Sequence, residues 1–306
     1  MQSPQIIFLV GPTAVGKSEI AVYLAKKLGA EIISCDSMQI YKGMDIISSQ
    51  ASLSLRRRVP HHLISTVSPV KEYNVSQFRK EALKKIKSII NKGKIPLFVG
   101  GTGLYMTILI DGIFELETKG KGLRERLYKQ AEKLGSDYLY ERLQKIDPEA
   151  AQKIHPNDTK RIVRALEVFE STGKPISILQ KQRRGLVHEY DVLFFGLNME
   201  RKKLYKRIDA RVEKMFRAGL LAEVKRLLKL RLSRTATYAI GIRELKGYFD
   251  GLYDLDEAQQ LMKRNTRAYA KRQLTWFRKD KRIKWISVQD KEKPASIANR
   301  IWKKLY

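Results

Sequence analysis

Gly11-Pro12-Thr13-Ala14-Val15-Gly16-Lys17-Ser18 decides the fold of this chain, because it fits the phosphate-binding pattern G-x-x-x-x-G-K-S. It lies between a short apolar run, residues 6–10, and Lys17–Leu28, where apolar residues recur at helical spacing. A strand, a glycine-rich loop and a helix in this order form a P-loop, whose backbone N–H groups surround phosphate oxygens. In such a loop Lys17 would meet the terminal phosphates and Ser18 would bind Mg²⁺. The default expectation from this motif is a kinase or NTPase that binds ATP.

Further short apolar runs, residues 31–35 and 95–99, alternate with segments of helical periodicity, of which residues 77–91 are the clearest. Alternating strands and helices predict a parallel sheet flanked by helices. The expected fold class is therefore α/β, of the P-loop NTPase type, with a helical insertion.

The insertion is predicted from a change of pattern in the middle third of the chain. No strand is expected between about residues 120 and 185, and residues 158–172 have the pattern of a helix that ends at Gly173. Strands are expected again at residues 192–197 and 283–287. We predict a first core segment over residues 1–117, a helical insertion over residues 118–188, and a return to the core with basic C-terminal helices over residues 189–306.

Composition narrows the class of partner. The chain has 306 residues, of which 43% are hydrophobic, so it can bury a sizeable core. Its 61 Lys and Arg against 32 Asp and Glu give a net charge of +29, which favours a polyanionic partner, although it could also serve solubility alone. The single Cys35 excludes a disulfide within the chain, and no apolar stretch is long enough to span a membrane. A cytoplasmic protein is expected.

Two more segments follow predicted strands, at the sheet edge where α/β proteins bind ligands. Asp36 comes directly after residues 31–35, where it could hold Mg²⁺, accept a proton from a nucleophile or cap the next turn. Gly100-Gly101-Thr102-Gly103 follows residues 95–99. Its glycines would admit a ligand or a neighbouring backbone, or form a plain tight turn, and Thr102 offers a hydroxyl.

These segments resemble those of the bacterial tRNA dimethylallyltransferases. The resemblance runs in order over nearly the whole chain, through Gly11–Ser18, Asp36-Ser-Met-Gln39, Pro60-His-His-Leu63, Gly100-Gly-Thr-Gly-Leu-Tyr105, His155-Pro-Asn-Asp158 with Arg161 to Glu167, and Thr266-Arg-Ala-Tyr-Ala-Lys-Arg-Gln-Leu-Thr-Trp-Phe-Arg278. Several of these matches are long and unusual, which a generic P-loop kinase would not explain.

The resemblance implies a prenyl transfer from dimethylallyl diphosphate to N6 of the adenosine just 3′ of the anticodon, in tRNAs that read codons beginning with U. Lys17, the loop N–H groups, Ser18 with Mg²⁺ and Arg211 would stabilise the leaving diphosphate. By similarity Asp36 would take the proton of the amine, and Thr102 would orient the amine or the diphosphate.

The resemblance also implies how tRNA is bound. The expected contacts are Asp36, Ser37, Met38 and Gln39 with an extruded adenine, together with Thr102, Arg124, Lys160, Arg161, Ile162, Val163, Arg164, Tyr238, Gly241 and Arg243. A stripe of basic residues, Arg264, Arg267, Lys271 and Arg278, is either a further phosphate contact or a solvated helix face. We expect a monomer, and we expect His61, His62 and His155 to be turn or core histidines rather than metal ligands.

Three departures from the family pattern fall near these segments. Ile46-Ile47-Ser48-Ser49-Gln50-Ala51 stands where the family usually has Ile-Gly-Thr-Ala-Lys-Pro. Ser65 stands where Asp is typical, and Ile242 where an aromatic residue is common. The residues expected to do the chemistry are unaffected, so these changes bear on how tRNA is held.

Three other functions are compatible with parts of the sequence. A P-loop kinase for a small metabolite would place ATP in the loop and use Asp36 to activate a hydroxyl. An isopentenyltransferase for adenylate would prenylate free AMP, ADP or ATP. A passive RNA-binding module would bind tRNA without forming a product.

Overall fold

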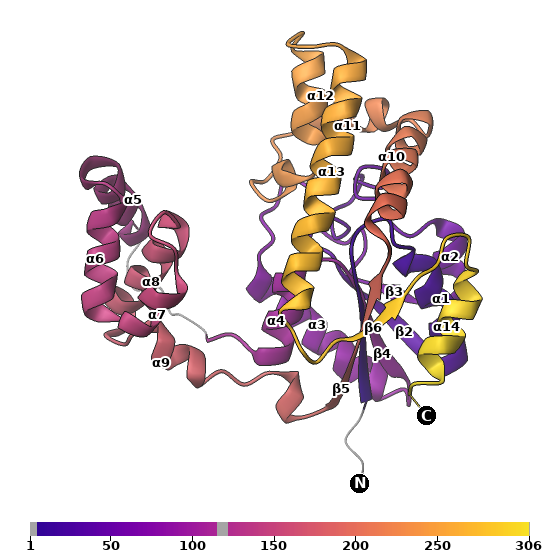
Figure 1. The fold of residues 1–306 in the computed structure, drawn as a ribbon, viewed down its shortest axis with the longest axis horizontal. Coiled ribbons are helices and arrows are strands. Elements are labelled where there is room, and N and C mark those ends of the chain that lie inside the picture. The colour runs from indigo at the N-terminus through magenta and orange to yellow at the C-terminus, as the bar shows by residue number, and fades with distance from the viewer. Residues whose placement is uncertain (1–4, 115–121, 306) are drawn as a thin grey trace. The chain divides into compact units, whose positions relative to one another are not determined.

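The structure is a computed structural model that describes residues 5–114 and 122–305 (Figure 1). The chain forms two compact units: Ile110–His188 is one, and the stretches before and after it form the other. The predicted boundary between residues 117 and 118 lies outside the described residues. No helix in the described part of the chain is both long and apolar enough to cross a membrane.

The first unit is built on a six-stranded sheet in which every pair of neighbours is parallel. The strands, in the order β3-β2-β4-β1-β5-β6, are β3 (His61–His62), β2 (Ala30–Cys35), β4 (Ile95–Gly100), β1 (Gln5–Val10), β5 (Asp191–Asn198) and β6 (Lys284–Ser287). This confirms the predicted α/β class and all five predicted strands to within one residue at each end. The two-residue strand β3 was missed, because it is too short for any periodicity to show.

Helices flank this sheet or extend beyond the carboxyl ends of its strands (Figure 1). They are α1 (Lys17–Leu28), α2 (Leu53–Arg58), α3 (Val75–Ile90), α4 (Gly103–Asp111), α10 (Arg201–Arg217), α11 (Leu220–Leu228), α12 (Ile242–Phe249), α13 (Leu255–Arg278) and α14 (Pro294–Trp302). Alternate residues of β1 separate the two faces of the sheet. Ile7 and Leu9 lie in a core shared with α1 and α14, whereas the ring of Phe8 stacks on Phe98 and Phe194.

The register of the sheet aligns the ends of its three central strands. Val10 at the end of β1 pairs with Gly100, and Gly100 pairs with Cys35 at the end of β2. The strand that follows β1 in the chain, β2, lies on one side of the central pair β4 and β1, and the strand that follows β4, β5, lies on the other side. Such a reversal of strand order opens a ligand crevice at the carboxyl edge of an α/β sheet. The loops beginning at Gly11, Asp36 and Gly101 therefore start side by side.

The second unit is helical throughout its described residues. It contains α5 (Leu123–Leu134), α6 (Ser136–Ile146), α7 (Pro148–Lys153), α8 (Thr159–Thr172), α9 (Ile176–Lys181) and a 3₁₀ turn, Leu186–His188. Helix α8 begins where the Asp158 side chain accepts a hydrogen bond from the Arg161 N–H, and it ends at Gly173 in the left-handed conformation, as predicted. Leu127, Leu139 and Leu166 are among the apolar residues that give this unit a core of its own.

Candidate active site

The P-loop follows β1 and delivers the chain to α1. Gly16 takes a left-handed conformation (φ 101°) as the N-cap of that helix, which leaves the first N–H groups of α1 directed into the loop. The Lys17 ammonium lies inside the loop, where it donates hydrogen bonds to the carbonyl oxygens of Gly11 at 2.9 Å and Pro12 at 2.7 Å. Lys17 and the helix N-terminus thus bring positive charge to one place.

The electrostatics of Lys17 depend on its burial. Burial lowers the pKa of the ammonium from 10.5 to about 7, Asp36 opposes that decrease, and the guanidinium of Arg211 adds to it. A bound anion would restore the charge of Lys17, because a diphosphate contributes several negative charges at short distance. The loop is therefore a site whose positive charge increases when its ligand arrives.

Asp36 starts the loop after β2. Its Oδ1 accepts hydrogen bonds from the backbone N–H groups of Met38, at 2.9 Å, and Gln39, at 3.4 Å. The alternative in which Asp36 caps the following turn is thus correct. It does not exclude chemistry, because both of these bonds end on Oδ1 and Oδ2 is left to accept a proton.

Thr102 connects the loop after β4 to the loop that carries Asp36. Its hydroxyl oxygen accepts a hydrogen bond from the Ser37 N–H at 3.1 Å, and its own N–H donates to the carbonyl oxygen of Cys35 at 3.2 Å. The hydroxyl of Thr102 therefore lies beside the residue that follows Asp36, which brings together two of the three residues predicted to be catalytic.

Arg211 reaches the same place from α10. Its Nη1 donates to the hydroxyl of Thr13 in the P-loop at 3.2 Å, and its Nε donates to the hydroxyl of Ser49 at 2.9 Å. Arg211 also interacts electrostatically with Asp36. The structure thus gathers Asp36, Thr102 and Arg211 around the P-loop.

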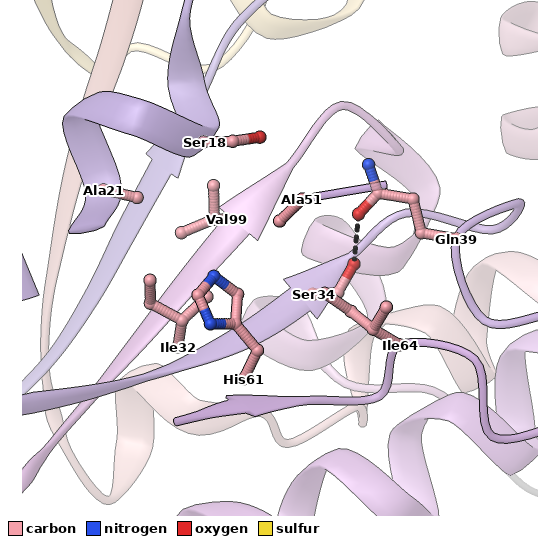
Figure 2. Close-up of a pocket in the computed structure, with 9 residues that line it drawn as sticks. All are labelled: Ser18, Ala21, Ile32, Ser34, Gln39, Ala51, His61, Ile64 and Val99. Carbon is pink, nitrogen blue, oxygen red and sulfur yellow. Dashed lines mark hydrogen bonds between the residues drawn. The ribbon is translucent and has the colours of Figure 1, made fainter. Parts of the chain in front are cut away.

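A small hollow opens beside Ser18 (Figure 2). Its walls are largely apolar and come from α1, β2 and β4 and from the loops around them; they include Ala21, Ile32, Ala51, Ile64 and Val99. Its polar groups are Ser18, His61 and the linked pair Ser34 and Gln39, in which the Ser34 hydroxyl donates to Gln39 Oε1 at 3.1 Å. An apolar cavity with a few oriented polar groups is typical of a small-molecule site.

The glycines of Gly100-Gly101-Thr102-Gly103 serve protein contacts. A Cβ atom on Gly100 would lie 2.0 Å from the carbonyl oxygen of Cys35 on the neighbouring strand. Cβ atoms on Gly101 and Gly103 would lie 2.1 Å from Gln273 Nε2 and 2.3 Å from Trp276 Cδ1, both on α13. The structure therefore confirms one of the alternatives drawn from the sequence, the close approach of neighbouring protein atoms.

Two of the departures from the family pattern, Gln50 and Ser65, contact each other. The Ser65 hydroxyl donates to Gln50 Oε1 at 3.1 Å, and Gln50 Nε2 donates to the carbonyl oxygens of Gln39 and Tyr41, each at 3.1 Å. A Cβ atom on Gly241, the neighbour of Ile242, would lie 3.1 Å from Ile47 Cδ1.

The loop that contains these departures is held from α11. The buried carboxylate of Glu223 accepts hydrogen bonds from the N–H groups of Ile46 and Ile47 at 2.8–3.1 Å. Sequence reasoning missed Glu223, because an acidic residue in an amphipathic helix gives no sign that it binds a distant loop.

The residues expected to contact tRNA from the second unit differ in how exposed their side chains are. Lys160 and Arg161 are exposed on α8, and buried Glu167 joins Arg124 and Arg164 through bonds of 2.6 and 2.7 Å. Burial opposes ionisation of Glu167, but hydrogen bonds from both arginines lower its pKa overall.

Ile162 and Val163 differ from these basic neighbours, since their side chains are 0% and 1% exposed in the core of the second unit. Their expected contact with tRNA is corrected to this extent: helical periodicity turns these two side chains inward, away from any RNA on the surface.

The remaining expected contacts lie in the first unit. Tyr238 is 51% exposed, and the guanidinium of Arg243 lies 5.4 Å from the centre of its ring. Gly241 caps α12, where its N–H donates to Glu244 Oε2 at 2.7 Å. In the basic stripe of α13, Arg267 forms an ion pair with Asp209 at 3.1 Å.

The three histidines considered as metal ligands, His61, His62 and His155, each form a hydrogen bond within the protein. His61 bonds to the Val59 carbonyl, His62 to the Glu31 carboxylate, and His155 accepts the Asn157 N–H, so each has a local partner as predicted. Cys35 is buried. In the described part of the chain, no three His, Cys, Asp or Glu side chains are placed to hold a metal ion together.

A parallel sheet with a P-loop after β1, an acidic residue after β2 and an arginine of α10 that donates to the loop defines a phosphate-binding α/β protein of the P-loop class. Comparison with known families makes this more specific. Residues 39–280 match the IPP transferase family, and residues 4–59 match the Isopentenyl transferase family. The chain belongs to the IPP transferase family, as the resemblance of its motifs predicted.

Relatives and solved structures agree with this assignment. The tRNA dimethylallyltransferase of Carboxydothermus hydrogenoformans is 50% identical over 301 residues, which are 98% of this chain and 96% of that protein. The full-length tRNA isopentenylpyrophosphate transferase of Bacillus halodurans is 39% identical with a TM-score of 0.72, over 99% of this chain and 97% of that chain. A eukaryotic dimethylallyltransferase acting on tRNA is 31% identical with a TM-score of 0.85, over 98% of this chain and 78% of that chain.

Proposed function

We propose that this chain transfers the dimethylallyl group of dimethylallyl diphosphate to N6 of the adenosine just 3′ of the anticodon in tRNA. In this reaction the bond from N6 to the allylic carbon forms, the bond from that carbon to the diphosphate oxygen breaks, and one N6 proton is released. The observation that carries the proposal is the convergence of Asp36, Thr102 and Arg211 on one P-loop, in a chain whose named relatives act on tRNA.

Each of these residues has a role that its contacts favour. Lys17 and the N–H groups at the start of α1 would hold the diphosphate, and Arg211, fixed by Thr13, would oppose the negative charge that develops as it leaves. Asp36 would accept the N6 proton on Oδ2, since Oδ1 is occupied by Met38 and Gln39. Thr102 would orient the amine.

The hollow beside Ser18 supports binding of a prenyl donor. A five-carbon tail needs apolar walls next to the phosphate-binding loop, and Ala21, Ile32, Ile64 and Val99 provide them (Figure 2).

Mg²⁺ is part of the proposal. It binds proteins through one or two oxygen ligands together with substrate phosphates and water, so the Ser18 hydroxyl fits as its protein ligand. When bound, Mg²⁺ would neutralise part of the charge on the diphosphate.

The tRNA is proposed to contact residues in both units. Arg124, Lys160, Arg161 and Arg164 would bind phosphates from the second unit and Arg243 from the first, where Tyr238 and Gly241 would form part of the same contact surface. Asp36, Ser37, Met38, Gln39 and Thr102 would meet the extruded adenine.

The proposal is tested by incubating the purified protein with Mg²⁺, dimethylallyl diphosphate and unmodified tRNA whose anticodon ends in adenosine. Digestion and mass spectrometry of the nucleosides should show isopentenyl-adenosine. Consumption of ATP without RNA would favour the kinase, product on free AMP, ADP or ATP would favour the adenylate enzyme, and tRNA binding without product would favour the passive module.

The monomeric state and the cytoplasmic location stay predictions. Gel filtration would test the first and cell fractionation the second.

A further inference from the structure

Gln273 joins two loops of the active site. From the C-terminal part of α13 its Oε1 accepts a hydrogen bond from the backbone N–H of Thr13 at 2.8 Å, and its Nε2 donates to the carbonyl oxygen of Gly101 at 2.9 Å. Thr13 belongs to the P-loop and Gly101 precedes Thr102. A single side chain therefore connects the segment proposed to hold the diphosphate with the segment proposed to orient the acceptor.

The amide of Gln273 is fixed in one orientation. Turning it over would set Nε2 against the Thr13 N–H and Oε1 against the Gly101 oxygen, so that donor would face donor and acceptor would face acceptor. The side chain is 5% exposed, and water cannot easily replace either bond.

The loop after β4 is shaped around this side chain. A Cβ atom on Gly101 would lie 2.1 Å from Gln273 Nε2, so only glycine leaves room for the amide. One turn further along α13, Trp276 lies against Gly103 in the same way. Two glycines of one loop thus allow α13 to approach it closely.

A second residue of α13 extends the contact to Thr102. The hydroxyl of Tyr269, one turn before Gln273, interacts with the side chains of Thr102 and Gln273. Burial raises the pKa of this hydroxyl and the Asp36 carboxylate raises it further, so Tyr269 stays a neutral phenol. Tyr269 and Gln273 therefore both lie next to the loop that carries Thr102.

We propose that Gln273 is a positioning residue for prenyl transfer, which rests on the function proposed above. By holding Thr13 and Gly101 together, it fixes the distance between the leaving diphosphate and the base that attacks. Displacing reacting groups by about 1 Å can reduce a rate by about a hundredfold, even when the change is remote from the bond that breaks.

The test compares Gln273→Met, which keeps the volume of the side chain and loses both bonds, with Gln260→Met on the exposed side of the same helix. For Gln273→Met we expect kcat to fall about ten- to a hundredfold, with Kd for tRNA within about twofold of wild type. Hydrogen exchange at the Thr13 amide should become faster, since its bond to Gln273 is lost. Gln260→Met should match wild type in all three measurements.

Gln273→Glu provides a second variant. A carboxylate can still accept the Thr13 N–H but cannot donate to the Gly101 oxygen, so we expect its kcat to lie between wild type and Gln273→Met, and it decides the question if Gln273→Met does not fold. Wild-type kcat in a folded variant, or a loss of tRNA affinity equal to the loss of rate, would overturn the positioning role. A wild-type chain that forms no prenylated adenosine would instead overturn the proposed function, whatever the exchange at Thr13 shows.

Discussion

The Nη1 of Arg211 donates a hydrogen bond to the Thr13 hydroxyl at 3.2 Å, between residues 198 positions apart in the sequence. The contact places a guanidinium at the side of the P-loop that is nearest to α10. Because arginine stays protonated, its charge is available to a leaving group at any physiological pH.

Replacing Arg211 should therefore affect the chemical step. We expect Arg211→Ala to lower kcat by about 10²–10³, the usual effect of removing one donor that stabilises developing charge. Single-turnover kinetics with saturating donor would measure it. Arg217→Ala, exposed on the same helix, is the matched control and should keep wild-type kcat; a similar loss in both variants would show a general effect of charge.

Asp36→Asn tests the proton acceptor. The amide oxygen can still accept the N–H groups of Met38 and Gln39, so the turn should be kept while the basic oxygen is lost. We expect kcat to fall by about 10²–10⁴, measured by the yield of isopentenyl-adenosine over time. Asp45→Asn changes a nearby exposed carboxylate and should retain activity. An active Asp36→Asn enzyme would rule out Asp36 as the base.

Diphosphate binding should depend on pH through Lys17. Its pKa of about 7 leaves the free amine mostly neutral above that pH, whereas a bound diphosphate favours the ammonium. Binding then takes up a proton, and the affinity for inorganic diphosphate should fall as pH rises from about 7 to 9.

Isothermal titration calorimetry at about pH 8, in two buffers with different ionisation enthalpies, measures this uptake. Lys17→Arg corrects for the protonation of diphosphate itself, because its guanidinium is charged throughout. Equal proton uptake by the two proteins would contradict the prediction.

Gln50 and Ser65 should be energetically coupled, because the Ser65 hydroxyl donates to the Gln50 amide oxygen. Ser65→Asp alone would set a carboxylate against that oxygen and beside Asp45, and we expect the free energy of unfolding to fall by about 1 kcal/mol. Adding Gln50→Lys supplies the opposite charge typical of the family at this position and should recover about 0.2–1 kcal/mol. Urea unfolding of the two single variants and the double variant gives the coupling energy, and simple additivity would show that the side chains do not interact.

The parts of the site that the sequence predicted depend on local pattern. Residues 11–18 form a P-loop because glycines, a strand and a helix stand in a fixed order within a few residues. Asp36 could be placed because the carboxyl ends of parallel strands share one sheet edge. Both inferences needed only the type of neighbouring element.

The missed residues act over long sequence separations. Glu223 binds the N–H groups of Ile46 and Ile47 from 177 and 176 positions away, and Gln273 binds Thr13 from 260 positions away. Gln273 lies within the basic stripe of α13, where the periodicity could not distinguish a side chain directed to the sheet edge from one directed to solvent. Such contacts follow from the packing of α11 and α13, which no local pattern specifies.

The place of β1 in the sheet sets an order of events during synthesis. β1 pairs with β4 on one side and with β5 on the other, and β5 begins at Asp191, after all of Ile110–His188 has been made. Until then the strand that carries the P-loop has one unpaired edge, which is open to wrong partners on a nascent chain. The insertion lengthens this period, but it has its own core: once folded, it spares β5 the entropic cost of closing a long flexible loop when β5 pairs with β1.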